Sequence, residues 1–147
     1  MSVFGKSFSV LDISGSGLTA ERARMRVIAN NIANAQVTET RSGGPYKRQQ
    51  VEFESILNQS MKSRFSKEAD MNGVKIKGIT QSKDSPNRVY IPGHPKANKD
   101  GFVEMPNVSV SKEMVDLIAA SRSYEANTSV VTTYRKMNER ALNIIRR

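Results

Sequence analysis

The feature that most constrains the fold is a long seam near the C-terminal end, in which residues recur alternately three and four positions apart. Its members are Leu117, Ala120, Tyr124, Asn127, Val131, Tyr134, Asn138, Ala141 and Ile145. This spacing is typical of a helix that packs lengthwise against another helix. Residues 110–147 contain neither glycine nor proline, so no residue in the segment breaks the helix. The sequence therefore predicts a paired helix over about 110–147.

Two asparagines interrupt the apolar character of this seam. Asn127 and Asn138 would lower stability if they were buried, but a buried seam asparagine also fixes the register and the partner of a coiled coil. The alternative is that both side chains face solvent. The sequence supports the two interpretations equally.

The N-terminal end carries a matching pattern with a period of seven. Its members are Phe4, Leu11, Leu18, Met25 and Ile32. Because residues 14–17 have low helix propensity, we expect a helix from about Phe8 to Asn34 that is weakened or bent at the glycines. A second apolar series lies on another face of that helix, namely Val10, Ile13, Ala20 and Val27. One partner helix cannot cover both faces, so the pattern predicts contact with a further chain.

Asparagines also cluster where the N-terminal helix should end. Asn30, Asn31 and Asn34 precede a segment that contains Gly43 and Gly44. Asparagine tolerates left-handed backbone geometry and caps exposed carbonyl groups. We expect these residues to form a helix-end hinge that sets the direction in which the chain leaves the helix. The alternative is an ordinary polar helix end.

The middle of the chain differs from both ends, because residues 36–107 hold all five prolines and most of the turn signals. Short alternating runs at 51–53 and 74–77 predict strands, and Asp100-Gly101 predicts a turn. Polar residues with little periodicity predict a mobile loop near 58–73.

The predicted fold class is therefore α+β, with two domains. Residues 1–35 and 108–147 would form a discontinuous helical coiled-coil domain. Residues 36–107 would form a small β-rich domain inserted between its two helices.

The charge of the chain raises the possibility of a nucleic-acid partner, since 23 basic residues against 14 acidic ones give a net charge of +9. A basic nucleic-acid-binding module is therefore the alternative function. The excess charge is spread over both ends and the middle, and no basic cluster is interleaved with aromatic residues. Solvated surface charge is the favoured interpretation.

Candidate catalytic and ligand-binding residues are few. The single histidine, His94, lies between Gly93 and Pro95 in a predicted turn, and the chain contains no cysteine. Gly15-Ser16-Gly17 lacks the remaining residues of a phosphate-binding loop. Glu52 and Glu54 alternate with apolar residues and should line the wet face of a strand. The sequence thus predicts no catalytic residue, no cofactor and no metal site, with a hydrolase based on His94 as a distant alternative.

Export and membrane signals are also missing from the sequence pattern. Asp12 and several glycine and serine residues interrupt the only apolar stretch near the N-terminus, and no uncharged run is long enough to span a bilayer. We expect no cleaved signal peptide and no membrane-spanning segment.

Several motifs along nearly the whole chain resemble the flagellar axial proteins of the rod and hook. The general family signature is carried by residues 12–20 and 29–35. Further matches are residues 43–46, His94-Pro95, Ala97-Asn98, residues 100–103, Pro106-Asn107 and residues 113–127. This combination resembles the proximal-rod members of that family.

The resemblance implies a structural subunit of the basal-body rod, which crosses the periplasm and transmits torque without catalysis. It also implies that the terminal helices form an inner domain around an export channel and the middle segment an outer domain. The implied partners are other rod proteins, copies of the chain itself, base components of the basal body and the flagellar type III export apparatus.

Overall fold

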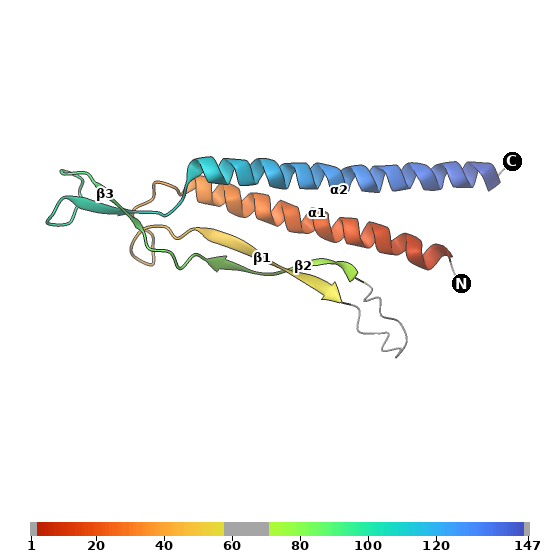
Figure 1. Ribbon diagram of the computed structural model, residues 1–147, viewed down its shortest axis with the longest axis horizontal. Helices are drawn as coiled ribbons and strands as arrows, with labels where there is room; N and C mark the ends of the chain where they lie inside the picture. The colour runs from red at the N-terminus through yellow and green to blue at the C-terminus, as the bar shows by residue number, and fades with distance from the viewer. Residues whose placement is uncertain (1–2, 58–70, 146–147) are drawn as a thin grey trace.

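The computed structural model describes residues 3–57 and 71–145, which form two long helices and four strands. Their bounds are α1 Val3–Ala33, β1 Gln49–Leu57, β2 Met71–Gln81, β3 Asn87–Tyr90, β4 Phe102–Met105 and α2 Val110–Ile145. The fold class is therefore α+β, as the sequence predicted. Figure 1 shows an elongated molecule, in which the helices run side by side and the chain termini lie at the same end.

Three layers make up the body of the molecule. Helix α1 contacts α2 on one side and both strands of the β1–β2 sheet on the other, so it lies between them (Figure 1). The helices are antiparallel, since Asn31 near the end of α1 meets Glu113 at the start of α2. Further along the pair, Gly17 lies against the side chain of Asn127.

Helix α1 is longer and more regular than the sequence predicted, because it begins at Val3 and continues through the glycines. The contact at Gly17 gives a physical reason. A Cβ atom at this position would lie 3.0 Å from Asn127 Nδ2, which is tighter than ordinary packing. Glycine therefore lets the two helices approach closely, and this packing offsets its low helix propensity.

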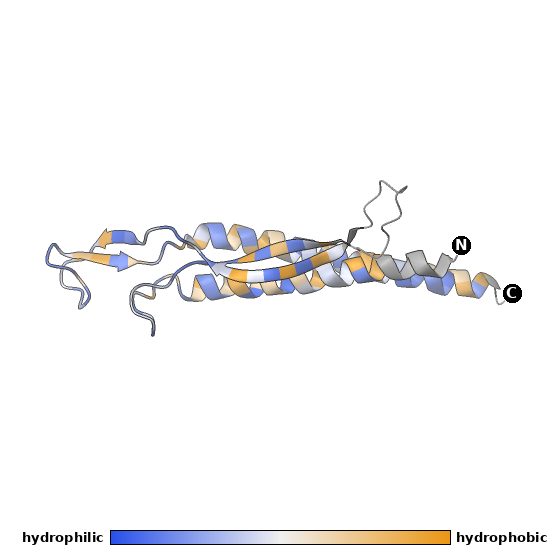
Figure 2. Cartoon of the chain, turned by 90° about the horizontal axis from the view of Figure 1, so that it is seen from below, coloured by the Kyte–Doolittle hydropathy of each residue, from blue (hydrophilic) through white to orange (hydrophobic). Residues whose placement is uncertain are grey.

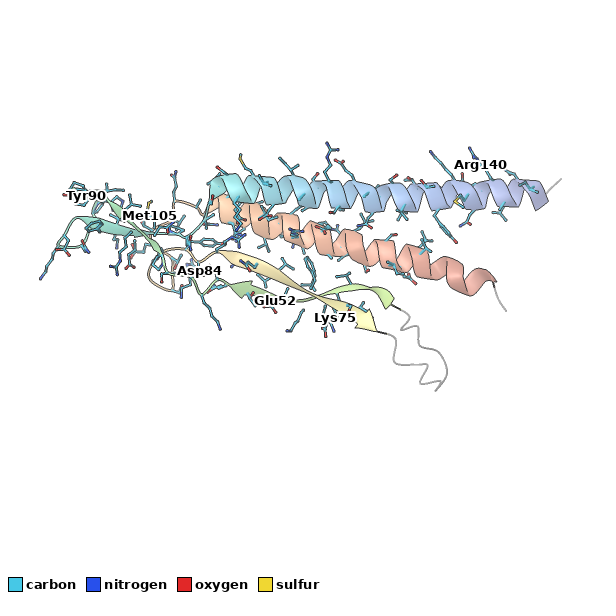
Figure 3. All side chains as sticks on the ribbon, in the orientation of Figure 1. Glu52, Lys75, Asp84, Tyr90, Met105 and Arg140 are labelled. Carbon is cyan, nitrogen blue, oxygen red and sulfur yellow. The ribbon has the colours of Figure 1, made fainter. Side chains whose placement is uncertain are left out.

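Strands β1 and β2 form an antiparallel two-stranded sheet whose register runs from Gln49 opposite Gln81 to Leu57 opposite Met71. Hydrophobic and hydrophilic residues alternate along both strands (Figure 2). Glu54 pairs with Lys75 at 3.3 Å, and Glu52 pairs with Lys77 at 3.7 Å. Figure 3 shows Glu52 and Lys75 pointing away from the helices. The carboxylates of Glu52 and Glu54 therefore lie on the solvent-exposed face of the sheet, as expected.

Strands β3 and β4 form a separate antiparallel pair that extends past the joined ends of the helices (Figure 1). The rings of Tyr90 and Phe102 meet edge to face with centroids 5.3 Å apart. The turn at Asp100-Gly101 is closed by Asn98, whose Oδ1 accepts hydrogen bonds from the backbone N–H groups of Asp100 and Phe102. Gly101 has a φ of 81°, the left-handed geometry that favours glycine.

Ser16 of α1 forms a hydrogen bond with the start of β2. The backbone N–H of Val74 donates to Ser16 Oγ at 3.1 Å, and Gly73 adopts a φ of 113° beside it. A Cβ atom at Gly73 would overlap Ser16 Oγ. Of the loop predicted near 58–73, residues 58–70 lie outside the described residues, and residues 71–73 belong to β2.

This contact predicts that Gly73→Ala destabilises the fold. Both the positive φ and the overlap oppose a side chain, and together they should lower the free energy of unfolding by about 2 kcal/mol. Gly78→Ala is the matched control in the same strand, because a Cβ atom at Gly78 would meet no other atom within 4 Å. Urea unfolding of the purified chain would measure both variants, and equal midpoints would contradict the structural role of this contact.

Candidate functional site

The most deeply buried large side chains include two polar ones. Glu113 is 0% exposed and Asn31 is 1% exposed, while the buried apolar residues of the described part of the chain are Ala20, Val27, Ile28, Val103 and Ala120. Glu113 lies in the first turn of α2, and Asn31 lies just before the end of α1. Buried polar groups are expensive unless they are paired, so their partners define this part of the structure.

The amide of Asn31 is fully hydrogen bonded. Its Nδ2 donates to Gln49 O at 2.9 Å and to Glu113 Oε2 at 3.0 Å. Its Oδ1 accepts from the Tyr46 hydroxyl and from the backbone N–H of Gln49, each at 2.9 Å. One side chain therefore holds the end of α1, the first residue of β1 and the first turn of α2 together.

The carboxylate of Glu113 is neutralised by Arg48. Arg48 Nε donates to Glu113 Oε1 at 2.6 Å, and its Nη2 lies 3.6 Å from Asp116 Oδ2. Arg24 approaches the other oxygen of Asp116 at 3.9 Å. The guanidinium of Arg48 thus bridges two carboxylates that are nearly one helical turn apart on α2.

Tyr46 completes this cluster as a neutral donor. Burial raises the pKa of the Tyr46 hydroxyl, and the negative charge of Glu113 raises it further, while a hydrogen bond from Asn30 acts in the opposite direction. The phenol therefore keeps its proton and donates to Asn31. We call the set Asn31, Tyr46, Arg48, Gln49, Glu113 and Asp116 the helix joint.

The three asparagines predicted at the helix end all lie at or beside the joint. Asn30 donates to Tyr46 and to the side chain of Gln49, and Asn34 Nδ2 donates to Asn30 O at 2.8 Å. Among the described residues, however, only glycines have positive φ. Of the two expected properties of asparagine, Asn34 therefore uses the capping of a carbonyl group by its amide and not the left-handed backbone.

The predicted seam of α2 divides into two parts. Ala120 is fully buried, and Leu117, Tyr124, Asn127, Val131 and Tyr134 are half-buried. Asn138 and Ala141 are exposed, and the side chain of Ile145 lies outside the described residues. Of the two seam asparagines, Asn127 faces α1 and Asn138 faces solvent.

The predicted α1 series is only partly buried. Leu11, Leu18, Met25 and Ile32 are half-buried, and the side chain of Phe4 lies outside the described residues. The most buried positions of α1 are instead Ser14, Ala20, Val27, Ile28 and Asn31. The assignment of the leucine series to the helix contact stays a prediction.

Catalytic chemistry finds little support in the described part of the chain. His94 Nδ1 accepts a hydrogen bond from the backbone N–H of Lys96 at 3.1 Å, within a turn. Within residues 3–57 and 71–145, no three metal-ligating side chains gather into a possible ion site. Neither helix of this part combines the length and the apolar character that a membrane crossing requires.

Comparisons with known proteins give a consistent result. The family model "Flagella basal body rod protein" matches residues 11–39, and "Flagellar basal body rod FlgEFG protein C-terminal" matches residues 99–144. The flagellar basal-body rod protein FlgC of Borreliella burgdorferi is 40% identical over 147 aligned residues, with 94% of this chain and 97% of the relative covered. FlgC of Bacillus subtilis is 41% identical with the same coverage. FlgC of Escherichia coli O6:H1 is 38% identical, with 92% and 96% covered.

Proposed function

The chain belongs to the family of flagellar basal-body rod proteins FlgC, and from this premise we propose that it is a structural subunit of the proximal rod. Its role is mechanical and not enzymatic. It assembles with sister rod proteins and with copies of itself into the shaft that crosses the periplasm, encloses the export channel and transmits torque.

One observation carries this proposal beyond the family relationship, namely the number of apolar side chains that remain exposed along α2. The exposed apolar residues of this helix are Val110, Met114, Val115, Ile118, Val130, Met137, Leu142 and Ile144. Ile144 alone is 76% exposed. Surfaces of this kind mark protein contacts, so the helix pair is suited to packing among other helices.

We also propose a finer organisation. Residues 1–35 and 108–147 act as the inner coiled-coil domain, and residues 36–107 act as the inserted outer domain. The predicted interface residues line contacts within and between subunits, and they are Leu11, Leu18, Met25, Ile32, Leu117, Ala120, Tyr124, Asn127, Val131, Tyr134 and Ile145. The chain reaches the rod through the flagellar type III export apparatus, without a cleaved signal peptide, and contacts base components of the basal body.

A direct test is deletion of the gene followed by complementation with the full chain. Cells that lack the chain should be non-motile and should contain basal bodies without a completed rod, as seen by electron cryotomography. Complementation should restore both. Complete rods in the deletion strain would overturn the proposal.

Nucleic-acid binding receives no support from the comparisons. It would predict tight binding to duplex DNA that weakens steeply as the salt concentration rises. We expect only weak binding without sequence preference.

Replacing the asparagines at the end of α1 tests their role as a hinge. Replacing Asn31 and Asn34 together by alanine removes the amide that joins three elements and the amide that caps α1. The outer domain should then lose its fixed direction, so rods should fail to assemble while the variant is still exported. Asn138→Ala, on the exposed part of α2, is the control and should swim normally. Normal swimming of the double variant would remove the hinge from the assembly mechanism.

A further inference from the structure

Strands β3 and β4 pack against no other helix or strand of the described chain. Helix α1 contacts α2, β1 and β2, and β1 contacts β2, whereas β3 and β4 contact only each other among these elements. Figure 1 shows the pair standing beyond the joined ends of the helices. Each strand has four residues, and two such strands are only marginally stable in water by themselves. The position of this pair, residues 87–105, must therefore depend on the connecting segments. We call it the β3–β4 arm.

The segment that connects α1 to β1 forms a closed loop over residues 37–46. The backbone N–H of Tyr46 donates to Val37 O at 3.0 Å, so the two ends of the segment meet. Within it, the N–H of Thr40 donates to Gly44 O at 2.9 Å. The Tyr46 hydroxyl also donates to Asn31 in the helix joint. The 37–46 loop is therefore fixed to the body of the molecule.

The β3–β4 arm rests on this loop. Val103 of β4 is only 1% exposed, although β4 belongs to a two-stranded sheet that no helix covers. Val103 lines a cleft of about 330 Å³ together with Thr38 and Pro45, so the loop supplies the cover. The cleft also means that the two surfaces are not closely packed.

An ion pair joins the loop to the arm as well. Lys96, in the segment between β3 and β4, places its Nζ 2.7 Å from Glu39 Oε2. The two side chains are 52% and 58% exposed, and solvent and salt weaken such a pair. A loosely packed contact and an exposed ion pair thus hold the arm. The free-energy difference between a seated and a released arm is therefore small.

We propose that the β3–β4 arm moves as a unit relative to the rest of the molecule, and that the 37–46 loop is the seat that sets its direction. The β1–β2 sheet does not move with the arm, because Asn31 and Ser16 of α1 bind the backbone of β1 and β2. Residues 36–107 therefore contain two parts that move separately. This inference concerns the single chain and does not depend on the proposed function.

Spin-label distances in the purified full chain test the proposal, because the chain contains no native cysteine. Lys99→Cys places a label on the arm, and Ala119→Cys places one on the exposed side of α2. Pulsed electron paramagnetic resonance should give a single narrow distance. Glu39→Lys replaces the ion pair by repulsion between two cations and should add a second population at another distance. Adding Lys96→Glu restores a pair of opposite charges and should return the single distance.

A second label pair shows which part moves. Lys77→Cys with Ala119→Cys reports on the β1–β2 sheet and should keep one narrow distance in the Glu39→Lys background, which also shows that the variant is folded. Glu125→Lys disrupts a comparable exposed ion pair on α2, with Arg122 at 3.1 Å, and should leave both distances unchanged.

Four results would overturn the proposal. They are a broad arm distance before any charge is changed, an unchanged arm distance in Glu39→Lys, no recovery after the charge exchange, and a second population in the distance to the sheet. The last result would mean that residues 36–107 move as one body.

Discussion

Replacing Glu113 by alanine should lower the free energy of unfolding by about 3 kcal/mol, because it leaves the half-buried Arg48 without its main partner. Asn31 would also lose one of its four hydrogen bonds. For a chain of this length the melting temperature should fall by roughly 10 °C. Thermal unfolding of the purified full chain, followed by circular dichroism, would measure the change.

Two further variants show whether the burial of Glu113 causes the loss of stability. Glu125→Ala removes an exposed carboxylate that pairs with Arg122 on the same helix, and should change stability by less than about 0.5 kcal/mol. Glu113→Gln keeps the size of the side chain but removes its charge, and should give an intermediate loss. Equal melting temperatures for Glu113→Ala and Glu125→Ala would contradict the structural role of the joint.

Ala120→Glu should have the largest effect on assembly. Ala120 is 0% exposed at the contact between the helices, so a longer charged side chain must either force α2 away from α1 or be buried without a partner. Either outcome costs several kcal/mol, on the order of the whole stability of a small domain. Cells carrying this variant should be non-motile and should lack complete rods in electron cryotomograms.

The neighbouring residue provides the control. Ala119 is exposed, so Ala119→Glu introduces the same side chain one position away without burying it. Leu18→Glu and Val131→Glu, at half-buried seam positions, should fall between the two. Secretion of each variant must be measured, because retention in the cytoplasm would indicate a damaged export signal. Complete rods with Ala120→Glu would contradict the proposed role of the seam.

Periodic patterns made the helices and strands predictable, while the joint could not be foreseen. A helix repeats its environment every three or four residues, so the row from Leu117 to Tyr134 identified a paired side of α2. Glu113 and Arg48 are 65 residues apart in the chain, and neither belongs to a repeating pattern. An acidic residue in the first turn of a helix is ordinary, so Glu113 gave no sign of its buried partner.

The sequence pattern did not show which side of α1 contacts α2, for a related reason. Large apolar residues dominate sequence patterns, yet Gly17, which has no side chain, lies directly against Asn127 of α2. Leu18 and Met25 were predicted to line the contact, and both are half-buried in the structure. Small residues favour close packing between helices, but in a sequence a glycine indicates only low helix propensity.

The long separation between the two sides of the joint also fixes the order in which the molecule can fold. Strands β1 and β2 pair across a short segment, from Leu57 to Met71, and can form early because little chain entropy is lost. The bond between Asn31 and Glu113 closes a loop of 82 residues and needs both helices in place. We therefore expect the joint to form after the β1–β2 pair and before the contact between Gly17 and Asn127, which spans a longer stretch of chain. An incoming subunit could then have its strands folded before its two helices pack along their length.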